Sequence, residues 1–279
     1  MENKMKIAIS SESSVDLDKN LLEKYDIHVI PYEILLGDRI EVDGQISPEE
    51  IFDYTQKNKI LPKTSALNTE EYKNFFKQLL TKYDKVVHLS LSSGISSTFN
   101  NALLASKEFE NVVVIDSSSL STGIGIMAIR LREMIESGVE LEKAIESVKN
   151  MKMQVSAIIS NLNYMYKGGR CSSLAYFGAN LLKLKPRIIV ENGRVKNSHI
   201  YRGKNEKVLK DYFSDTLKQF PANKKLVSIT FTTISEEIKS LAKQLCEEYG
   251  FENIIFSQAG ATVSCHCGDN CVGIMYQCL

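Results

Sequence analysis

Hydroxyl side chains crowd the chain directly after a short apolar run at residues 86–91. The segment Ser92-Ser93-Gly94-Ile95-Ser96-Ser97-Thr98 separates that run from apolar residues with the spacing of a helix. At a strand-to-helix turn, free backbone N–H groups and hydroxyls converge on one point, which suits a phosphate or a carboxylate. We therefore predict an anion site that includes Ser93 and the N–H groups near Gly94, although the serines could simply cap the helix.

A second pair of hydroxyls, Thr64 and Ser65, lies between two predicted helices. Capping-box sequences open these helices at Ser47-Pro48-Glu49-Glu50 and at Asn68-Thr69-Glu70-Glu71, so neither hydroxyl is needed as a cap. Pro62 favours an extended chain before it, which leaves both hydroxyls free to bind a ligand. A polar surface loop is the alternative interpretation.

Two later segments, Lys167-Gly168-Gly169-Arg170 and residues 260–268, carry a cation and an imidazole. The two glycines allow the backbone at Arg170 to approach a bound group closely. Arg170 could contact an anionic ligand or form a salt bridge between domains. His266 could donate to a carboxylate, or it could be a structural residue that is hydrogen bonded within a turn.

Taken together and in this order, the segments resemble the DegV family, and the resemblance spans nearly the whole chain. The motifs that carry it are residues 6–14, Asp43-Gly44, Lys63-Thr64-Ser65, residues 91–98, Val114-Ile115-Asp116-Ser117, residues 167–170, Lys185-Pro186 and a late His-x-Gly at His266. Members of that family bind one long-chain fatty acid, such as palmitate, between two domains. The best understood members carry the acyl chain for a separate ATP-dependent fatty-acid kinase.

The resemblance implies a two-domain α/β fold and a role in lipid binding rather than catalysis. It pairs a three-layer α/β/α domain, with a mainly parallel sheet, with a two-layer α/β domain that has a mixed sheet. We expect the domains at residues 1–150 and 151–279, with the ligand cleft between them. The expected donors to the fatty-acid carboxylate are Thr64, Ser65, Ser93, Gly94, Arg170 and His266.

Two motifs depart from the family pattern. Glu12-Ser13-Ser14 stands where the family usually has Asp-Ser-Thr, which keeps the charge and moves the carboxylate by one methylene. His266-Cys267-Gly268-Asp269-Asn270-Cys271 stands where the family usually has His-x-Gly-Pro-Gly. Asp and Asn can still turn the backbone, but the rigid proline is replaced by an acidic residue. We expect this change to affect partner docking and the entrance for the ligand more than the fold.

The composition excludes several classes of protein. A chain of 279 residues favours about two domains, and its 34 basic and 34 acidic side chains create no overall field for nucleic acid. No apolar stretch approaches the roughly 20 residues of a transmembrane helix. Residues 1–5 lead into a strand rather than an apolar leader, so we expect a cytoplasmic protein.

Six cysteines are too few for a disulfide framework in a chain of this length. Cys265, His266, Cys267 and Cys271 could in principle bind zinc. If residues 265–267 form a strand, however, the two cysteines share one face and His266 takes the other. The sequence therefore predicts no metal site, with the cysteines acting as small buried apolar residues.

Periodicity predicts strands and helices in alternation through the first half, as expected for a parallel sheet. The second half mixes crossover connections with a hairpin at Asn192-Gly193. The predicted strands are 5–10, 28–35, 85–91, 111–116, 153–160, 187–191, 194–201, 226–232, 253–258 and 272–277. The predicted helices are 18–25, 48–58, 69–82, 96–108, one from Ser121, one from Glu140, 162–167, 173–183, 204–218 and 235–249.

Two enzyme interpretations are weaker. Gly123-Ile124-Gly125-Ile126-Met127-Ala128 fits the dinucleotide fingerprint, but it lies several residues beyond the end of the preceding strand. No phosphate-loop or kinase motif is present, so we predict no cofactor. A serine hydrolase acting on a lipid ester through Ser93 and His266 remains the alternative, although the G-x-S-x-G elbow is missing.

Overall fold

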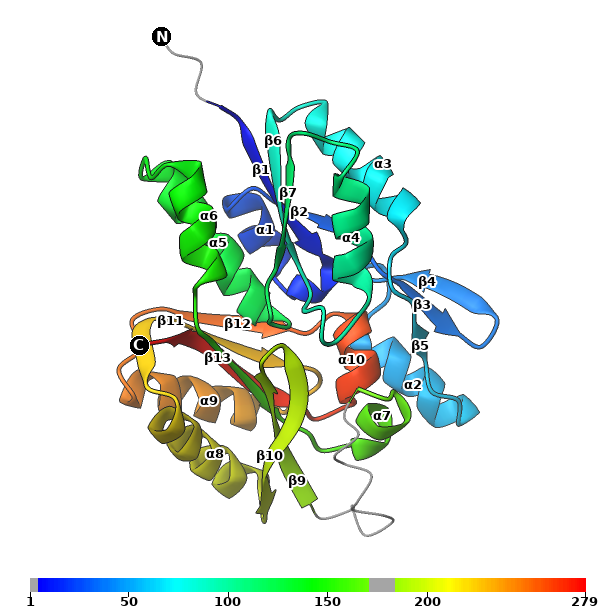
Figure 1. Cartoon of the computed structure of the whole chain (residues 1–279). Helices are drawn as coiled ribbons and strands as arrows, with labels where there is room; N and C mark the ends of the chain where they lie inside the picture. The colour runs from blue at the N-terminus through cyan, green and yellow to red at the C-terminus, as the bar shows by residue number, and fades with distance from the viewer. Residues whose placement is uncertain (1–4, 171–183) are drawn as a thin grey trace.

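The computed structural model describes residues 5–170 and 184–279, in which two central sheets lie one above the other (Figure 1). The first sheet has four parallel strands. In spatial order they are β2 (Ile27–Ile30), β1 (Ile7–Glu12), β6 (Lys85–Ser90) and β7 (Val112–Asp116). All six residues of β1 are buried, as expected for a parallel strand covered on both faces.

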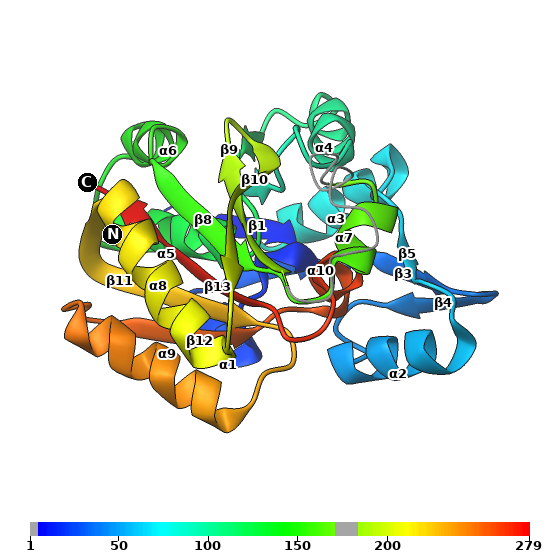
Figure 2. The same ribbon diagram turned by 90° about the horizontal axis from the view of Figure 1, so that it is seen from below.

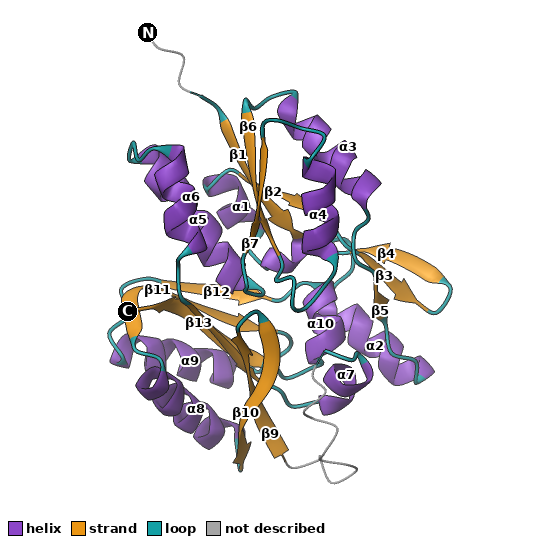
Figure 3. Ribbon diagram, viewed as in Figure 1, coloured by secondary structure: helices purple, strands orange, loops and turns teal. Residues whose placement is uncertain are grey.

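Helices cover both faces of this parallel sheet and complete a three-layer domain (Figure 3). One face carries α3 (Thr69–Leu80) and α4 (Thr98–Ser106). The other carries α1 (Lys19–Lys24), α5 (Thr122–Glu136) and α6 (Leu141–Lys149). The capping boxes predicted at Ser47 and Asn68 are both formed, and they begin α2 (Pro48–Asn58) and α3.

The second sheet has six strands and is mixed, because only β11 and β12 run parallel. Its strands in spatial order are β10 (Arg194–Arg202), β9 (Leu184–Glu191), β8 (Met153–Ile158), β13 (Val272–Cys278), β11 (Ala222–Phe231) and β12 (Ile254–Gln258). Helices α8 (Asn205–Gln219) and α9 (Glu236–Glu248) cover the face away from the first sheet (Figure 2). The chain passes from one sheet to the other between α6 and β8. Asn192 and Gly193, both with positive φ, form the predicted hairpin turn.

The strand predicted at 28–35 is two strands in two different sheets. β2 ends at Ile30, and β3 (Glu33–Leu36) pairs instead with β4 (Arg39–Val42) and β5 (Lys63–Thr64) in a small antiparallel sheet. Pro31 stands at the break, where its missing N–H cannot donate to a ladder. The small sheet therefore carries Thr64 away from the first sheet.

Residues 261–267 are a helix, so the predicted strand geometry of the late cysteines is wrong. α10 (Ala261–Cys267) begins after Gly260 and packs against α2 and α7 (Leu162–Lys167). Thr262 and Val263 have strand propensity, which tertiary packing overrides here. No group of three or more metal-binding side chains occurs within residues 5–170 and 184–279. The helix predicted at 173–183 lies outside the described residues.

Helix α5 lies between the two sheets and contacts both of them. A Cβ at Gly123 would lie 2.4 Å from Ser119 Oγ and 2.6 Å from Val155 Cγ2. A Cβ at Gly125 would lie 2.7 Å from Leu17 Cδ2. The two glycines therefore allow close helix packing, which explains the pattern that resembled a dinucleotide fingerprint.

We expect Gly123→Ala to lower the free energy of unfolding by about 1–3 kcal/mol, because the added methyl group overpacks this layer. Urea denaturation measures the effect. Glu136→Ala, at an exposed position on the same helix, is the control and should change stability by less than about 0.5 kcal/mol. Equal stability of the two variants would show that α5 can move away from the second sheet at little cost.

Candidate functional site

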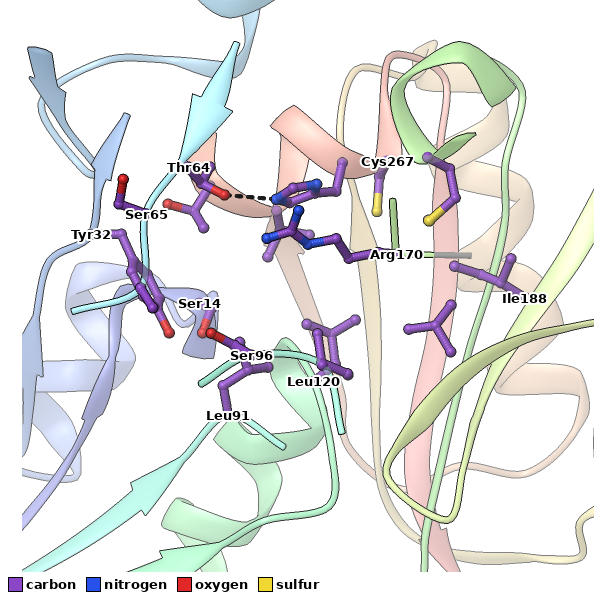
Figure 4. Close-up of a pocket in the computed structure, with 17 residues that line it drawn as sticks. Ser14, Tyr32, Thr64, Ser65, Leu91, Ser96, Leu120, Arg170, Ile188 and Cys267 are labelled. Carbon is purple, nitrogen blue, oxygen red and sulfur yellow. Dashed lines mark hydrogen bonds between the residues drawn. The ribbon is translucent and has the colours of Figure 1, made fainter. Parts of the chain in front are cut away.

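A pocket lies between the two halves of the chain, and we call it the interdomain pocket (Figure 4). It contains about 630 Å³ of space between atoms, part of which is open to solvent. Its lining comes from the turns after β1 and β6, from β5, α7 and α10, and from the β9–β10 hairpin. The lining residues are Ser14, Tyr32, Thr64, Ser65, Ala66, Leu91, Ile95, Ser96, Leu120, Met165, Arg170, Ile188, Val195, Thr262, Val263, His266 and Cys267.

Polar groups gather on one side of the interdomain pocket. Thr64 Oγ1 and His266 Nε2 are 2.8 Å apart, although they are separated by 202 positions in the sequence. Ser65 and Arg170 line the same pocket, and Nη1 of Arg170 donates to the Gly168 carbonyl at 2.6 Å. The structure therefore brings together four residues that the sequence predicted as carboxylate donors.

Ring nitrogen Nδ1 of His266 is buried and, among the described residues, has no hydrogen-bond partner. The close approach of Gly168 confines the ring, because a Cβ at Gly168 would lie 2.8 Å from Nδ1. Burial, assisted by the positive charge of Arg170, lowers the pKa of His266 to about 4. The imidazole is therefore neutral at pH 7.

Thr262 provides a second unpartnered polar atom in this pocket. Its Oγ1 is buried and makes no hydrogen bond to any residue that the structure describes. Buried polar atoms in folded proteins are nearly always hydrogen bonded, so unpartnered ones that face a cavity indicate a polar ligand group or bound water. Sequence reasoning missed Thr262 because it predicted no helix at this segment, and only a helix places Thr262 on the same face as His266, four residues later.

Two buried carboxylates, Asp16 and Asp43, hold the beginning of α10. Asp16 Oδ1 accepts from the Gly260 N–H at 2.8 Å, and Asp43 Oδ1 accepts from the Ala261 N–H at 2.9 Å. Burial raises the pKa of the Asp16 carboxyl well above its ordinary value, whereas hydrogen bonds from Ser121 and Gly260 act in the opposite direction. These contacts position the helix that carries His266 and Thr262.

Ser93 and Gly94, predicted as ligand donors, are exposed and do not line the interdomain pocket. Their turn contacts the β9–β10 hairpin instead. Ser92 Oγ donates to the Gly193 carbonyl at 2.7 Å, and a Cβ at Gly94 would lie 2.5 Å from that carbonyl oxygen. The hydroxyl of this turn that does line the pocket is Ser96. The turn that the sequence singled out therefore reaches the pocket through Ser96 and not through the predicted Ser93 and Gly94.

Glu12, the first departure from the family pattern, is fully buried beneath this turn. It accepts hydrogen bonds from Tyr72 Oη at 2.6 Å, Ser90 Oγ at 2.8 Å and the Leu91 N–H at 2.9 Å, and it pairs with His88 Nε2 at 2.9 Å. Burial alone would raise the pKa of Glu12, but the interactions with His88, Tyr72 and Leu91 outweigh it and lower the pKa. The carboxylate therefore fixes the start of the turn that leads to the pocket.

A second space, the inner cavity, adjoins the interdomain pocket between α5, α10 and the six-stranded sheet. It contains about 430 Å³ of space between atoms, part of which is open to solvent, and it shares Leu120, Ile188, Val263 and Cys267 with the interdomain pocket. Two of its hydroxyls are engaged within the protein: Ser121 Oγ donates to Asp16 Oδ2, and Thr230 Oγ1 pairs with Thr122 Oγ1, each at 2.5 Å. The residues lining the inner cavity are Leu120, Ser121, Val155, Ser156, Ala157, Ile188, Ile189, Val190, Thr230, Phe231, Thr232, Ala259, Val263, Cys267, Cys271 and Met275.

The geometry gives no support to a serine hydrolase. His266 Nε2 contacts Thr64 rather than Ser93, and no carboxylate among the described residues orients Nδ1. A Ser–His–acid triad needs the nucleophile and an orienting group on opposite sides of the imidazole.

Comparison with known proteins identifies the family. The family model described as "Uncharacterised protein, DegV family" matches residues 6–278. A curated protein of Thermotoga maritima, named "Fatty acid-binding protein", is 32% identical over 96% of each chain. A DegV lipid-binding protein from the same organism has a crystal structure that matches with a TM-score of 0.85, 30% identity and coverage of 98% and 99%. The structure "Fatty Acid Binding of a DegV family Protein" from Thermus thermophilus matches with a TM-score of 0.86, 28% identity and coverage of 99% and 100%.

The chain therefore belongs to the DegV family, as the motifs had indicated. Its two-domain α/β fold is also the one that the resemblance implied. Across residues 5–170 and 184–279, none of the helices has the length and apolar character needed to cross a bilayer.

We expect the imidazole of His266 to titrate near pH 4 rather than near the ordinary 6.5, because the charged form is disfavoured by burial and by Arg170. NMR titration, with the signal assigned by its loss in His266→Gln, measures this. A pKa that is lower in the folded than in the unfolded state destabilises the fold as the pH falls from about 6.5 to 4. His266→Gln should therefore lose less stability than the unmodified protein over this pH range. A pKa near 6.5 would contradict the buried environment.

Proposed function

We propose that the protein binds one long-chain fatty acid in the interdomain pocket and the inner cavity, and presents the carboxylate to a separate ATP-dependent kinase. The observation that carries the proposal is that the two spaces adjoin: a pocket with polar groups on one side shares four lining residues with a space whose lining is almost wholly apolar. A fatty acid has the same division into a polar head and an apolar tail. Relatives that share the fold over nearly the whole chain are named for fatty-acid binding.

The polar side of the pocket suits a carboxylate. Thr64, Ser65, Ser96 and Thr262 offer hydroxyl donors, and Arg170 offers a cation nearby. Charge-assisted hydrogen bonds to a carboxylate are stronger than neutral ones. They offset the free-energy cost of moving the carboxylate out of water. Neutral His266 supports binding through Thr64, because an Nε2–H that donates to Thr64 Oγ1 leaves the Thr64 hydroxyl proton free for the carboxylate.

The inner cavity suits an acyl tail. Its hydroxyls already have partners within the protein, so an apolar chain there displaces no required hydrogen bond. Each methylene removed from water contributes about 0.8 kcal/mol, so a tail of a dozen methylenes outweighs the cost of ordering the ligand. The same cavity left empty would expose apolar surface, which favours a resident lipid.

The proposal assigns no catalytic residue to this chain. A carboxylate held at the open pocket remains accessible to a second protein, and phosphorylation there would give an acyl phosphate that stays bound through its tail. The kinase supplies the ATP site, and we expect the two proteins to meet in the cytoplasm. A hydrogen bond from Asn161 Nδ2 to Asp269 Oδ1 at 3.0 Å holds the Asp269–Asn270 turn, which follows the pocket residue Cys267 in the chain.

Removal of a head-group donor should weaken binding without unfolding the protein. We expect Thr64→Val and Ser96→Ala each to weaken palmitate binding by about 1–3 kcal/mol, because each removes a donor to a buried charge. Calorimetric titration of delipidated protein measures the affinity. Ser93→Ala, a serine-to-alanine change in the same turn but outside the pocket, is the control and should bind like the unmodified protein. Loss of affinity in Ser93→Ala alone would place the carboxylate elsewhere.

The kinase step has its own test, because fatty-acid binding and presentation can fail separately. With palmitate, ATP and a bacterial fatty-acid kinase subunit, acyl phosphate should form only when this chain is present. His266→Ala should lower that rate more than it lowers palmitate affinity, since a group near the reacting carboxylate acts mainly on the reacting state. ATP turnover or ester hydrolysis by the chain alone would contradict a carrier role.

A further inference from the structure

The end of the inner cavity is built from three adjacent strands whose side chains alternate between the two faces of the sheet. In the register of β8, β9 and β13, Ala157 lies beside both Ile188 and Gly273. Two residues further along, Val155 lies beside Met275, and Val190 lies two residues after Ile188. Residues two apart share a face, so these six side-chain positions face α5 and the cavity. The side chains of Ser156 and Ile274, between them, point to the opposite face, where Ser156 Oγ pairs with Tyr212 Oη of α8 at 2.8 Å and Ile274 packs in the core with α8 and α9.

The two rows differ in the size of their side chains. The first row has the small residues Gly273 and Ala157, and the second has the larger residues Met275 and Val155. Gly273 has no side chain, and a Cβ there would lie 2.7 Å from the Ser156 carbonyl oxygen, 3.0 Å from Met275 Cε and 3.2 Å from Ala157 Cβ. The Gly273–Ala157 row therefore carries the smallest side chains of the cavity floor, and the Met275 side chain packs over Gly273. Ile188 in this row also lines the interdomain pocket, which places the row toward the polar end.

The second row closes the cavity. Val155 and Met275 are buried together with Ile126 of α5 in one cluster, with Val190 packed against them. Their Cα atoms lie roughly 7 Å beyond those of the Gly273–Ala157 row, at two residues of strand rise, and the Met275 side chain reaches back to Gly273. A tail that enters past Ile188 therefore meets the methionine side chain.

We propose that Met275, together with Val155 and Val190, ends the acyl channel and sets the length of fatty acid that the protein binds. This inference rests on the proposed function and adds to it a basis for selecting fatty acids by chain length. Methionine at the wall is a flexible, unbranched side chain, so it can be shortened with little strain on its neighbours. Its truncation extends the channel toward Ile126, and a longer tail fills the space that the side chain leaves.

The test measures dissociation constants of delipidated protein for saturated fatty acids from laurate to arachidate. In Met275→Ala, the length of tightest binding should move to longer acids. Each methylene that enters the new space should tighten binding about fourfold relative to the unmodified protein. Met275→Leu keeps the volume of the side chain and is the matched control, so its length profile should stay unchanged.

Ala157→Val tests the same geometry from the opposite direction and does not depend on the stability of Met275→Ala. Added methyl groups in this row of small side chains should weaken the binding of palmitate and longer acids by tenfold or more, whereas laurate, whose tail is shorter, should be affected less. If each variant changed the dissociation constant by the same factor for every chain length, the assignment of Met275 would be overturned. Fatty-acid binding itself would remain intact. Absence of binding to unmodified protein at any length would refute the proposed function and this inference with it.

Discussion

Asp16 and Asp43 in the first half of the chain accept the first free N–H groups of α10 in the second half, and the geometry of the site depends on these contacts. The contacts join segments more than 200 positions apart. The N–H groups at the start of a helix have no acceptor within the helix, and a typical hydrogen bond to such a group contributes about 0.5–1.5 kcal/mol. A Cβ at Gly260 would lie 3.0 Å from Asp43 Oδ1 and 3.3 Å from Asp16 Oδ1, so glycine allows both carboxylates to approach. Because α10 carries Thr262, Val263, His266 and Cys267, this capping arrangement places one wall of the pocket.

The remaining walls are held by similar contacts between the two halves. Thr64 reaches His266 because Pro31 ends β2 and the chain enters a separate small sheet. The Ser92–Gly94 turn contacts the β9–β10 hairpin through Gly193 and thereby fixes the entrance beside Ser96. Beneath that turn, the buried Glu12 carboxylate accepts from Leu91 and sets the backbone from which the turn begins. The pocket is therefore a product of how the halves dock, and neither half contains it alone.

Local signals in the sequence were sufficient where a single segment determines its own conformation. Capping boxes located α2 and α3, and Asn192-Gly193 located the hairpin, because each signal rests on nearby hydrogen bonds or on positive φ. The signals failed where distant contacts decide. α10 has β-branched residues and becomes helical through capping by Asp16 and Asp43, which no local pattern reveals. Likewise, the Ser92–Thr98 turn showed that hydroxyls converge there, but only the position of Gly193 determines that Ser93 faces solvent and Ser96 faces the pocket.

The central claim, that the two adjoining cavities hold a fatty acid, is tested most directly by native mass spectrometry of the protein as purified from bacteria, with the released ligand identified after organic extraction. The account predicts one long-chain fatty acid per chain, lost when the protein is unfolded. A chain that carries no lipid as purified, and gains no mass when palmitate or oleate is added, would contradict it.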